Sequence, residues 1–347
     1  MASHTVRGDD VRLRSPAIER IPDAHGITLK RGCTTLRIDG VGATDVVTAV
    51  LDRTAGRGAA LGELLAPFES DSWDAIRSLV AELRARRLLL PAEVLQGDTV
   101  ESQLDVFYWH FGLPDEPSPT PPRDRMVIVA GLNRTSAQLV GLLEEAGFGQ
   151  IVAVSDPGLD DPLDGSGARA ARPATGGCWQ PDDADIVVAA TDFAGFGLMR
   201  PWNERCLRER RPFLPIVVQD LIVYVGPLVV PGATACFECF LRRRYSNLDD
   251  AAAREAVETG ERAGDHVEAL HPAVSSVAAD LAAIELTKFF MPWHTLKQVG
   301  CLLTMNLLAS HFVRQPVLRL PRCPACSTLN TRQPTAVMQG QLPDAGS

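Results

Sequence analysis

The sequence predicts an α/β protein in which a small winged-helix-like module precedes a larger, doubly wound α/β domain. Three observations predict this fold class. Apolar residues first alternate and then take helical spacing, a proline-rich segment follows, and a β-α-β pattern begins after it. With 347 residues, of which 46% are hydrophobic, the chain is long enough to fill the cores of two domains.

The N-terminal module begins with short strands. Ile27, Leu29, Leu36 and Ile38 alternate with polar residues, which is typical of half-buried strands. The spacing becomes helical in three segments, "ATDVVTAVLDRT", "GAALGELLAPF" and "SWDAIRSLVAELRARRLLL". In the third helix the residues expected to face the core are Ile76, Val80 and Leu83. We place this module at residues 17–95.

A linker and a second domain follow. Five prolines between Pro114 and Pro122 stiffen a linker that we place at 96–123. The run "RMVIVAGLNRTSAQLVGLLEEAGFGQIVAVSD" then indicates a strand, a turn, an amphipathic helix and a second strand. The second domain is predicted at 124–328 and a flexible tail at 329–347. Its long helix, "HPAVSSVAADLAAIELTKFFM", is predicted to bury the face that carries Val274, Val277, Leu281 and Ile284.

Charge and hydropathy exclude several classes of function. A formal net charge of −9 and a pI near 5.3 argue against a nucleic-acid or anionic-membrane surface as the main activity of the chain. The N-terminus carries charges where a signal peptide has its apolar segment, and apolar runs such as "LIVYVGPLVV" are too short to span a bilayer. We therefore expect a cytoplasmic protein with no membrane partner.

Two C-x-x-C motifs predict a metal site. They comprise Cys236 with Cys239 and Cys323 with Cys326, and Cys323 lies 84 positions after Cys239. Four thiolates suit a tetrahedral structural zinc, and a reducing compartment disfavours a disulfide framework. The alternatives are that these cysteines form a redox pair or that their spacing is a coincidence. The other cysteines are expected to be small buried apolar residues: Cys33, Cys178, Cys206 and Cys301.

The turn after the first strand of the second domain departs from a nucleotide-binding fingerprint. A G-x-G-x-x-G turn lets backbone N–H groups approach phosphate, whereas "GLNRTSA" keeps only Gly131. The only lysines of the chain are Lys30, Lys288 and Lys297, so the span between Lys30 and Lys288 offers no ammonium group for a phosphate. The sequence therefore predicts no ATP or dinucleotide site at this turn.

The N-terminal module is interpreted as a peptide-binding module. Winged helices often bind DNA, and the third helix carries several arginines, but acidic residues lie close by and weaken the field that attracts phosphate. The strand "CTTLRID" is expected to be a sheet edge with free N–H and C=O groups, which can pair with an extended peptide. The run "RRR" at Arg242–Arg244, which follows the first C-x-x-C motif, is expected to be a solvated helix face, with partner or peptide contact as the alternative.

Several segments of the second domain together resemble one family. "RMVIVAGLNRTSAQLVGLLEEAGFGQIVAVSD", "DADIVVAATD", "RPWNERC", "HPAVSSVAADLAAIELTKF" and "CPAC" resemble the ThiF-like, ubiquitin-activating-enzyme-like family. "GPLVVPGATACFECFLRRR" is the most specific segment, and resembles the ocin-ThiF-like or cyclodehydratase C branch of thiazole/oxazole-modified peptide and bacteriocin biosynthesis. Residues 17–95 resemble the PqqD-like peptide-recognition element of such clusters.

The resemblance implies a Rossmann-like ThiF-type domain and a division of labour. This chain would bind the leader of a ribosomal precursor peptide, while a YcaO-family partner uses ATP to cyclise Cys, Ser or Thr. It implies that the four motif cysteines bind structural zinc, that the chain forms a homodimer, and that an azoline dehydrogenase can be a further partner. Asp192 matches the family's strand-end "TD", and Arg200, Asn203 and Cys206 keep its R-x-x-N-x-x-C spacing. The S-N-L-x-R-Q-like segment of adenylating members is missing after Asp156.

The sequence is thus interpreted as a leader-peptide-binding scaffold subunit of an azoline-forming cyclodehydratase, with no catalytic residue of its own. Leaders of the family dock between the edge strand and the third helix. The residues expected to contact the peptide here are Thr34, Thr35, Leu36, Arg37, Ile38, Trp73, Arg77 and Arg84. Two alternatives stay open: a self-sufficient adenylating enzyme of ThiF or MoeB type, and a dinucleotide-dependent oxidoreductase.

Overall fold

The computed structural model describes residues 11–95, 101–161, 184–193, 195–247, 249–250, 252, 270–291 and 299–327. The chain divides into two compact units. The first comprises Met1–Pro121, with Met291–Trp293, and the second Pro122–Phe290 together with the residues from His294 on. The step from Pro121 to Pro122 falls inside the segment predicted as a linker. No helix of the described residues has the length and apolar character that a membrane span requires.

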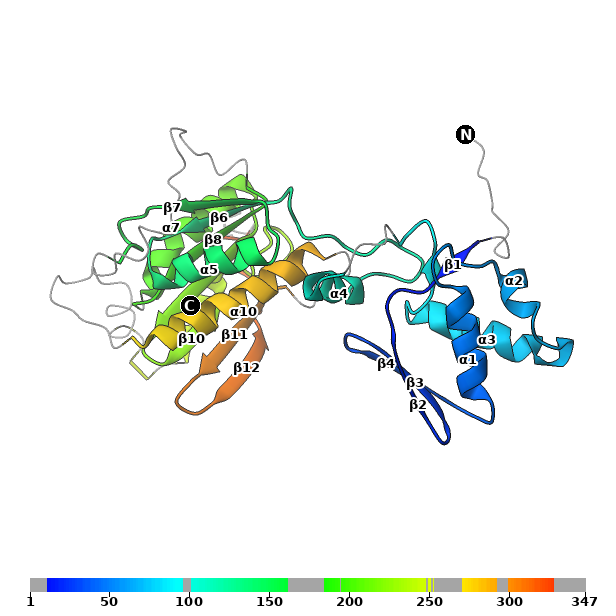
Figure 1. Cartoon of the computed structure of the whole chain (residues 1–347). Helices are drawn as coiled ribbons and strands as arrows, with labels where there is room; N and C mark the ends of the chain where they lie inside the picture. The colour runs from blue at the N-terminus through cyan, green and yellow to red at the C-terminus, as the bar shows by residue number, and fades with distance from the viewer. Residues whose placement is uncertain are drawn as a thin grey trace, which may run out of the picture. The chain divides into compact units, whose positions relative to one another are not determined.

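The first unit contains a three-stranded antiparallel sheet in the order β2-β3-β4 (Figure 1). Its strands are β2 (Glu19–Asp23), β3 (Gly26–Arg31) and β4 (Thr34–Asp39). Ile27, Leu29 and Leu36 are buried and Ile38 packs against the same core, which confirms the predicted alternation. Among the described residues β4 pairs only with β3, so one side of β4 is a free edge.

Helices complete the core of the first unit. They are α1 (Ala43–Arg53), α2 (Leu61–Leu65) and α3 (Trp73–Ala85), and the short 3-10 turn η1 (Ser70–Ser72) leads into α3. Ile76, Val80 and Leu83 of α3 are buried, as predicted. The short strand β1 (Leu13–Arg14) pairs antiparallel with β5 (Leu90–Pro91) and joins the two ends of the module.

A further helix, α4 (Gln103–His110), packs on this unit although its residues fall in the predicted linker. Trp109 of α4 is only 2% exposed and belongs to the core that contains Ile76 and Val80. The guanidinium group of Arg31 lies 4.5 Å from the centre of the Trp109 ring, a favourable cation–π distance. The compact unit therefore continues past residue 95.

The second unit has a seven-stranded mixed sheet in the order β12-β11-β10-β9-β8-β6-β7. Four strands are parallel: β6 (Met126–Ala130), β7 (Gln150–Val154), β8 (Ile186–Thr191) and β9 (Phe213–Gln219). Antiparallel pairing then adds β10 (Ile222–Val225), β11 (Cys301–Asn306) and β12 (His311–Pro316). Strands β6 to β9 are almost entirely apolar because helices cover both faces of a parallel sheet.

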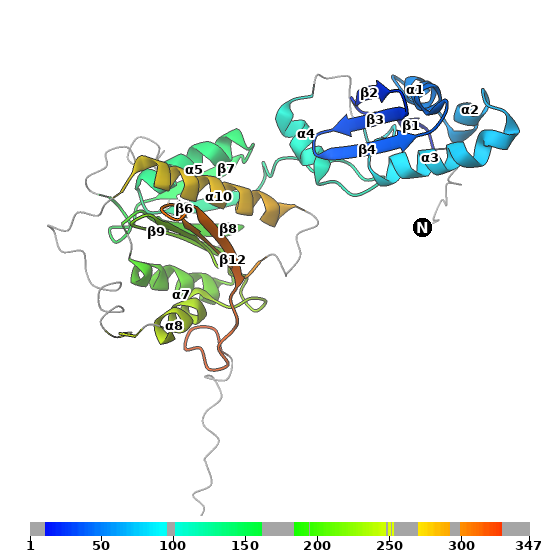
Figure 2. The ribbon, with the colours of Figure 1, turned by 90° about the horizontal axis from the view of Figure 1, so that it is seen from below.

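Helices lie on both faces of this sheet, as the prediction of a doubly wound domain requires (Figure 2). On one face lie α5 (Arg134–Glu145) and α10 (Pro272–Phe290), and on the other α7 (Arg200–Glu209) and α8 (Phe237–Ser246). The 3-10 turn η3 (Phe196–Met199) precedes α7. Each layer has its own core, one containing Val127 and Leu139 and the other Ile128 and Phe237.

The predicted buried face of α10 is wrong in detail. Ile284 is 51% exposed, and the residues buried along the helix are mostly small: Val274, Ser275, Ala278, Ala279, Ala282, Ala283, Leu286 and Thr287. These side chains let α10 pack directly against α5, β9 and β10. The spacing of the largest apolar residues predicted the wrong buried face, because the face of α10 that packs against its neighbours consists mainly of alanines.

Candidate functional site

The cysteines of the two C-x-x-C motifs form one cluster. All four Sγ atoms lie within 4.8 Å of one another, and the distances are 3.8 Å for Cys236–Cys239, 3.6 Å for Cys236–Cys323 and 3.5 Å for Cys239–Cys326. Sulfurs at about 2.3 Å from a tetrahedral zinc ion are about 3.8 Å apart, so the cluster has the dimensions of a zinc site. Four thiolates would fill the coordination sphere, which suits a structural metal and leaves no position for a substrate.

Local structure positions these sulfurs. Cys236 is the N-cap residue of α8 and Cys239 lies in its first turn. A hydrogen bond from Cys236 and another from the backbone N–H of Leu320, at 3.4 Å, lower the pKa of Cys239 well below its ordinary value. Burial raises the pKa of Cys326 to about 11. One sulfur is thus readily a thiolate, the form that binds metal.

The R-x-x-N-x-x-C residues of α7 hold the start of α8. Asn203 is buried, and its Oδ1 accepts a hydrogen bond from the N–H of Phe237 at 3.0 Å. Arg200 Nε donates to Glu238 Oε2 at 3.0 Å, while burial raises the pKa of Cys206 to about 12. These contacts join α7 to the helix that carries two of the cysteines, so they support the four-cysteine cluster.

The arginines after the first cysteine motif are not simply a solvated face. Arg242 donates to Glu238, and Arg243 Nε donates to the carbonyl oxygen of Leu318 at 2.8 Å. The guanidinium group of Arg244 lies 4.4 Å from the ring centre of Phe196 and 5.2 Å from that of Tyr224. Because carbonyl oxygens and aromatic rings are available on neighbouring segments, Arg243 and Arg244 pack within the unit, and the expectation of a solvated face is wrong for them.

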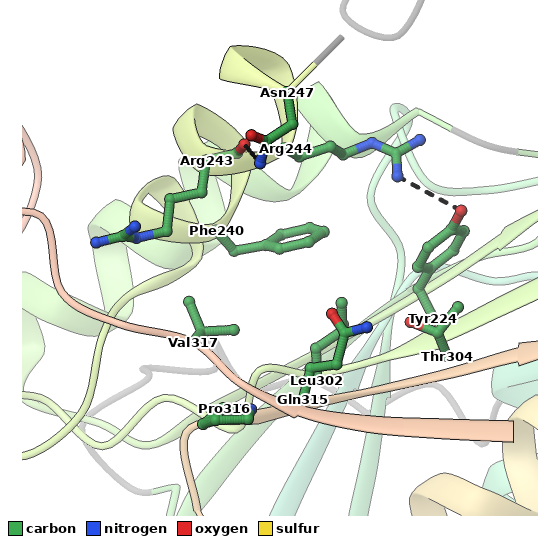
Figure 3. A pocket seen from close by; sticks show the side chains of 10 residues that line it. All are labelled: Tyr224, Phe240, Arg243, Arg244, Asn247, Leu302, Thr304, Gln315, Pro316 and Val317. Carbon is green, nitrogen blue, oxygen red and sulfur yellow. Dashed lines mark hydrogen bonds between the residues drawn. The ribbon is translucent and has the colours of Figure 1, made fainter.

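Sequence reasoning missed a cavity of about 270 Å³ beside these arginines (Figure 3). Phe240 extends into it from α8, opposite Leu302 and Val317, and Arg244 reaches the hydroxyl of Tyr224 at 3.4 Å. The remaining lining residues are Arg243, Asn247, Thr304, Gln315 and Pro316. The lining combines aromatic, aliphatic and cationic groups, and the RRR run beside Phe240 was the one sequence signal for it.

The turn between β6 and α5 uses its backbone N–H groups inside the protein. In a nucleotide-binding β-α-β unit, such groups at the helix N-terminus bind phosphate. Here the N–H of Leu132 donates to Asp160 Oδ1 at 2.6 Å, and the N–H of Arg134 donates to Asp192 Oδ2 at 3.0 Å. Two carboxylates therefore lie where a phosphate would have to bind.

Asn133 fills the rest of this turn. Its buried side chain caps α5 by accepting from the N–H of Ser136, and its Nδ2 donates to the carbonyl oxygens of Leu159 at 3.0 Å and Ala190 at 2.7 Å. Gly131 has a φ of 94°, and a Cβ added there would lie 2.6 Å from the Ala190 carbonyl oxygen. Close packing thus requires the glycine at position 131. At the position of the second glycine of G-x-G-x-x-G, the side chain of Asn133 fills the space.

Two acidic residues, one after β7 and one after β8, lie on either side of β6 and already have partners within the protein. Burial raises the pKa of Asp192 to about 6, and the charge of Asp161 adds to the shift. Asp156 follows the second strand, where nucleotide-binding units hold the ribose, but it accepts from Trp202 Nε1 at 2.7 Å and from the N–H of Gly158 at 2.8 Å. The segment in which adenylating members carry their S-N-L-x-R-Q-like motif lies largely outside the described residues.

The residues expected to bind a peptide lie on β4 and α3. Leu36 is buried, whereas Thr35 is exposed and Thr34 and Ile38 are half-buried. Arg37 forms ion pairs with Asp23 and Asp39, and its hydrogen bond holds the pKa of Asp23 well below the ordinary value. The three α3 residues predicted to contact a peptide have partners within the chain or lie at the surface: Trp73 is 36% exposed, Arg77 lies 5.9 Å from its ring, and Arg84 pairs with Asp115 at 2.9 Å.

A second cavity, of about 400 Å³, lies in the first unit between the start of β4, the end of α3 and α4. It is lined by Cys33, Thr34, Thr35, Ala85, Arg86, Arg87, Trp109, His110, Gly112 and Pro114. Cys33 is exposed, so the expectation that it is a buried apolar residue is wrong, because it lies in the open turn between β3 and β4. Cys206 is buried as expected, Cys301 is half-buried, and Cys178 lies outside the described residues.

Comparison with known proteins gives likeness in structure only. No protein-family profile and no curated protein matches the chain. The crystal structure of E. coli MccB matches with a TM-score of 0.62 and 14% identity, over 91% of this chain and 97% of that chain. The heterocyclase TruD matches with a TM-score of 0.59 and 18% identity, over 92% of this chain and 43% of that chain.

Further matches are of the same kind. A heterocyclase in complex with substrate and cofactor gives a TM-score of 0.57 and 16% identity, over 91% of this chain and 40% of that chain. MccB with AMPCPP and MccA gives a TM-score of 0.63 and 15% identity, over 91% of this chain and 99% of that chain. The chain thus has the fold of MccB over nearly its full length and spans less than half of the heterocyclases. At these identities the likeness establishes the fold alone.

Proposed function

We propose that this chain is the leader-peptide-binding subunit of an azoline-forming cyclodehydratase. Its first unit, a winged-helix-like module of PqqD type, binds the leader of a ribosomal precursor peptide along β4. A YcaO-type partner uses ATP and cyclises Cys, Ser or Thr residues of that peptide. The ThiF-like second unit is a scaffold stabilised by a structural zinc at Cys236, Cys239, Cys323 and Cys326, and the chain acts as a homodimer.

The free edge of β4 is the observation that carries this proposal. An edge strand offers a row of backbone N–H and C=O groups, and an extended peptide can add to it as a further strand. The start of β4 and the end of α3 line one cavity, so an added strand would also find side-chain contacts. Fold likeness to MccB, solved with MccA, and to the heterocyclase TruD is consistent with a role on peptides.

The turn after β6 supports a scaffold role for the second unit. A phosphate would have to displace Asp160 and Asp192 from the backbone N–H groups of Leu132 and Arg134. Carboxylates repel phosphate, so the exchange would cost free energy at neutral pH. ATP is accordingly assigned to the partner and no nucleotide to this chain.

A self-sufficient adenylating enzyme is the second candidate. One observation favours it: the chain covers 99% of MccB solved with ATP. Such an enzyme exchanges pyrophosphate into ATP when its carboxylate substrate is present. We expect the purified chain to show no exchange above background when it is incubated with the peptides described below, and activity to need an added YcaO-type protein. Exchange by the chain alone would establish the adenylating function instead.

Selection of peptides on the intact chain tests the proposed function. A display library of random peptides is panned against the immobilised protein, and selected peptides are labelled and titrated by fluorescence polarisation. We expect Thr35→Pro, which removes a backbone N–H from β4, and Arg77→Glu to weaken binding by about tenfold or more. Arg53→Glu makes the same charge change on α1 and is the matched control. Failure to enrich any peptide would contradict the proposal.

A further inference from the structure

The strand β12 forms one edge of the seven-stranded sheet, and its side chains are open to solvent on both faces (Figure 1). Among the described residues it pairs only with β11, and of its six residues five are exposed and Val313 is half-buried. Apolar side chains follow this edge: Phe312 is 49% exposed, and Leu308 and Leu318 on either side of the strand are 81% and 63% exposed. Proteins usually cover an exposed edge of this kind, so it indicates a strand that adds from outside.

The pairing with β11 fixes which backbone groups of β12 point outward. The N–H of Val317, directly after the strand, donates to the carbonyl oxygen of Gly300 at 2.9 Å. Antiparallel ladders alternate between residues whose N–H and C=O groups point to the partner strand and residues whose groups point away from it. The backbone groups of Val313 therefore point to β11, whereas those of its neighbours Phe312 and Arg314 point away from the sheet.

One antiparallel register pairs two copies of β12 without conflict. With Val313 of both copies on the two-fold axis, Phe312 of each copy lies directly opposite Arg314 of the other. Each of these pairs exchanges both backbone hydrogen bonds of an antiparallel ladder, and the guanidinium group can stack on the aromatic ring. A register centred on Arg314 would instead place two like charges opposite each other, and would need an N–H that Pro316 lacks.

The residues around the strand fit the same register. Leu308 and Leu318 each lie five positions from Val313, so the register carries Leu308 of one copy towards Leu318 of the other and covers two strongly exposed apolar side chains. On the face of Val313, His311 of one copy lies opposite Gln315 of the other. Gln315 lines the cavity of Figure 3, so a second copy would add a residue to the rim of that cavity.

We propose that β12 pairs antiparallel with β12 of a second copy of this chain, so that the two sheets continue into one, an inference that rests on the homodimer of the proposed function. A two-fold contact must match one surface to itself. This edge does so, because an aromatic ring lies opposite a guanidinium group in both halves of the contact and apolar residues lie opposite apolar residues at its centre and at its ends.

Two substitutions at one position test this register in the intact chain. Phe312→Lys puts an ammonium group opposite the guanidinium group of Arg314, whereas Phe312→Glu removes the same ring and puts a carboxylate there. We expect the dimer of Phe312→Lys to have a dissociation constant about tenfold or more above that of Phe312→Glu, as sedimentation equilibrium measures. Adding Arg314→Glu to Phe312→Lys should bring it back to within about threefold of Phe312→Glu, because the opposite charges are then restored.

A cross-link at the two-fold axis provides a second readout. A non-hydrogen-bonded antiparallel pair has its Cα atoms about 4.5 Å apart, which a disulfide can span. In a Cys33→Ser background, Val313→Cys should therefore form a disulfide-linked dimer on mild oxidation. The matched control is Gln315→Cys on the same face of the same strand. It should form none, because the two copies of position 315 are about 13 Å apart along the strands.

The outcomes separate this inference from the proposed function. Equal dissociation constants for Phe312→Lys and Phe312→Glu, or no disulfide in Val313→Cys, would overturn the contact at β12 and leave the homodimer with another interface. If Phe312→Lys fails to fold, as judged by circular dichroism, the cross-link decides. A monomeric wild-type chain would overturn this inference and the homodimer together. Peptide binding, titrated by fluorescence polarisation on the same variants, should stay unchanged because β4 belongs to the other unit, so its failure is recognised separately.

Discussion

Asp160 and Asp192 accept hydrogen bonds from the backbone of the turn after β6, at a place where α/β folds of this kind commonly bind phosphate. The missing glycines of "GLNRTSA" predicted the loss of a phosphate cradle. The two carboxylates could not be predicted, because Asp160 is 28 and Asp192 58 residues from the N–H group that it accepts from. Asn133 was recognised as an obstacle, but its three hydrogen bonds within the core follow only from the tertiary structure.

Asp192 should make stability depend on pH. Its folded pKa is about 6, raised by burial from an ordinary 3.8, so between these values the folded state holds a proton that the unfolded chain has released. Stability from this group is therefore lost as the pH rises from about 4 to about 6, by up to about 3 kcal/mol. We expect the difference in the free energy of unfolding between Asp192→Asn and the wild type to grow over that range. Urea titrations at several pH values measure it, and a constant difference would contradict the assignment.

Asn133 should contribute more to stability than an ordinary helix cap. Asn133→Ala removes the cap of α5 and leaves the buried carbonyl oxygens of Leu159 and Ala190 without their donor. We expect a loss of about 2–4 kcal/mol in the free energy of unfolding, from a cap and unpaired buried groups together. Ser102→Ala removes the exposed cap of α4 and should cost only about 1 kcal/mol. Equal losses in the two variants would show that the buried contacts of Asn133 are unimportant.

At the scale of elements, the cysteine cluster joins α8 to the segment that follows β12. The C-x-x-C spacing predicted this pairing of distant segments from the sequence, because the chemistry of four thiolates is independent of the fold around them. The cavity of Figure 3 lies between the same two segments, with Phe240 on one side and Val317 on the other. Loss of the metal should therefore disturb the lining of that cavity as well as the cluster.

Zinc binding is tested by removing single sulfurs. Cys239→Ser and Cys323→Ser should each reduce the zinc content of the purified protein from one per chain to near zero, since three ligands and a water bind zinc less tightly. The variants should also melt at lower temperature. Cys33→Ser, which changes an exposed cysteine outside the cluster, should keep both properties. Elemental analysis and thermal melts measure them, and a wild-type protein without stoichiometric zinc would contradict the assignment.

Local pattern predicted some elements and missed others. The apolar strands β6 and β8 and the helix α5 follow from a continuous β-α-β pattern, and Ile76, Val80 and Leu83 of α3 follow from helical spacing. The antiparallel half of the sheet did not follow, because β10 pairs with β11, which begins at Cys301, far along the chain. The place of α4 was missed for the same reason: it depends on the contact of Trp109 with Arg31.

At the scale of the whole molecule, the two units have different chemistry. The second unit holds a cluster of four cysteines and a turn whose N–H groups are already used, whereas the first presents a free strand edge with a cavity at its start. The proposed function accordingly places peptide binding in the first unit and structural support in the second. The composition, with its net charge of −9, predicted only that nucleic acid is a poor partner.

The central claim is that a peptide binds by pairing with β4. Hydrogen–deuterium exchange on the intact chain, with and without a selected peptide, tests it most directly, because a paired backbone N–H exchanges slowly. We predict slower exchange in Thr34–Asp39 on adding the peptide, no change in the opposite edge strand Glu19–Asp23, and no change in the turn Gly131–Arg134. Protection confined to the second unit, with β4 unaffected, would contradict the claim.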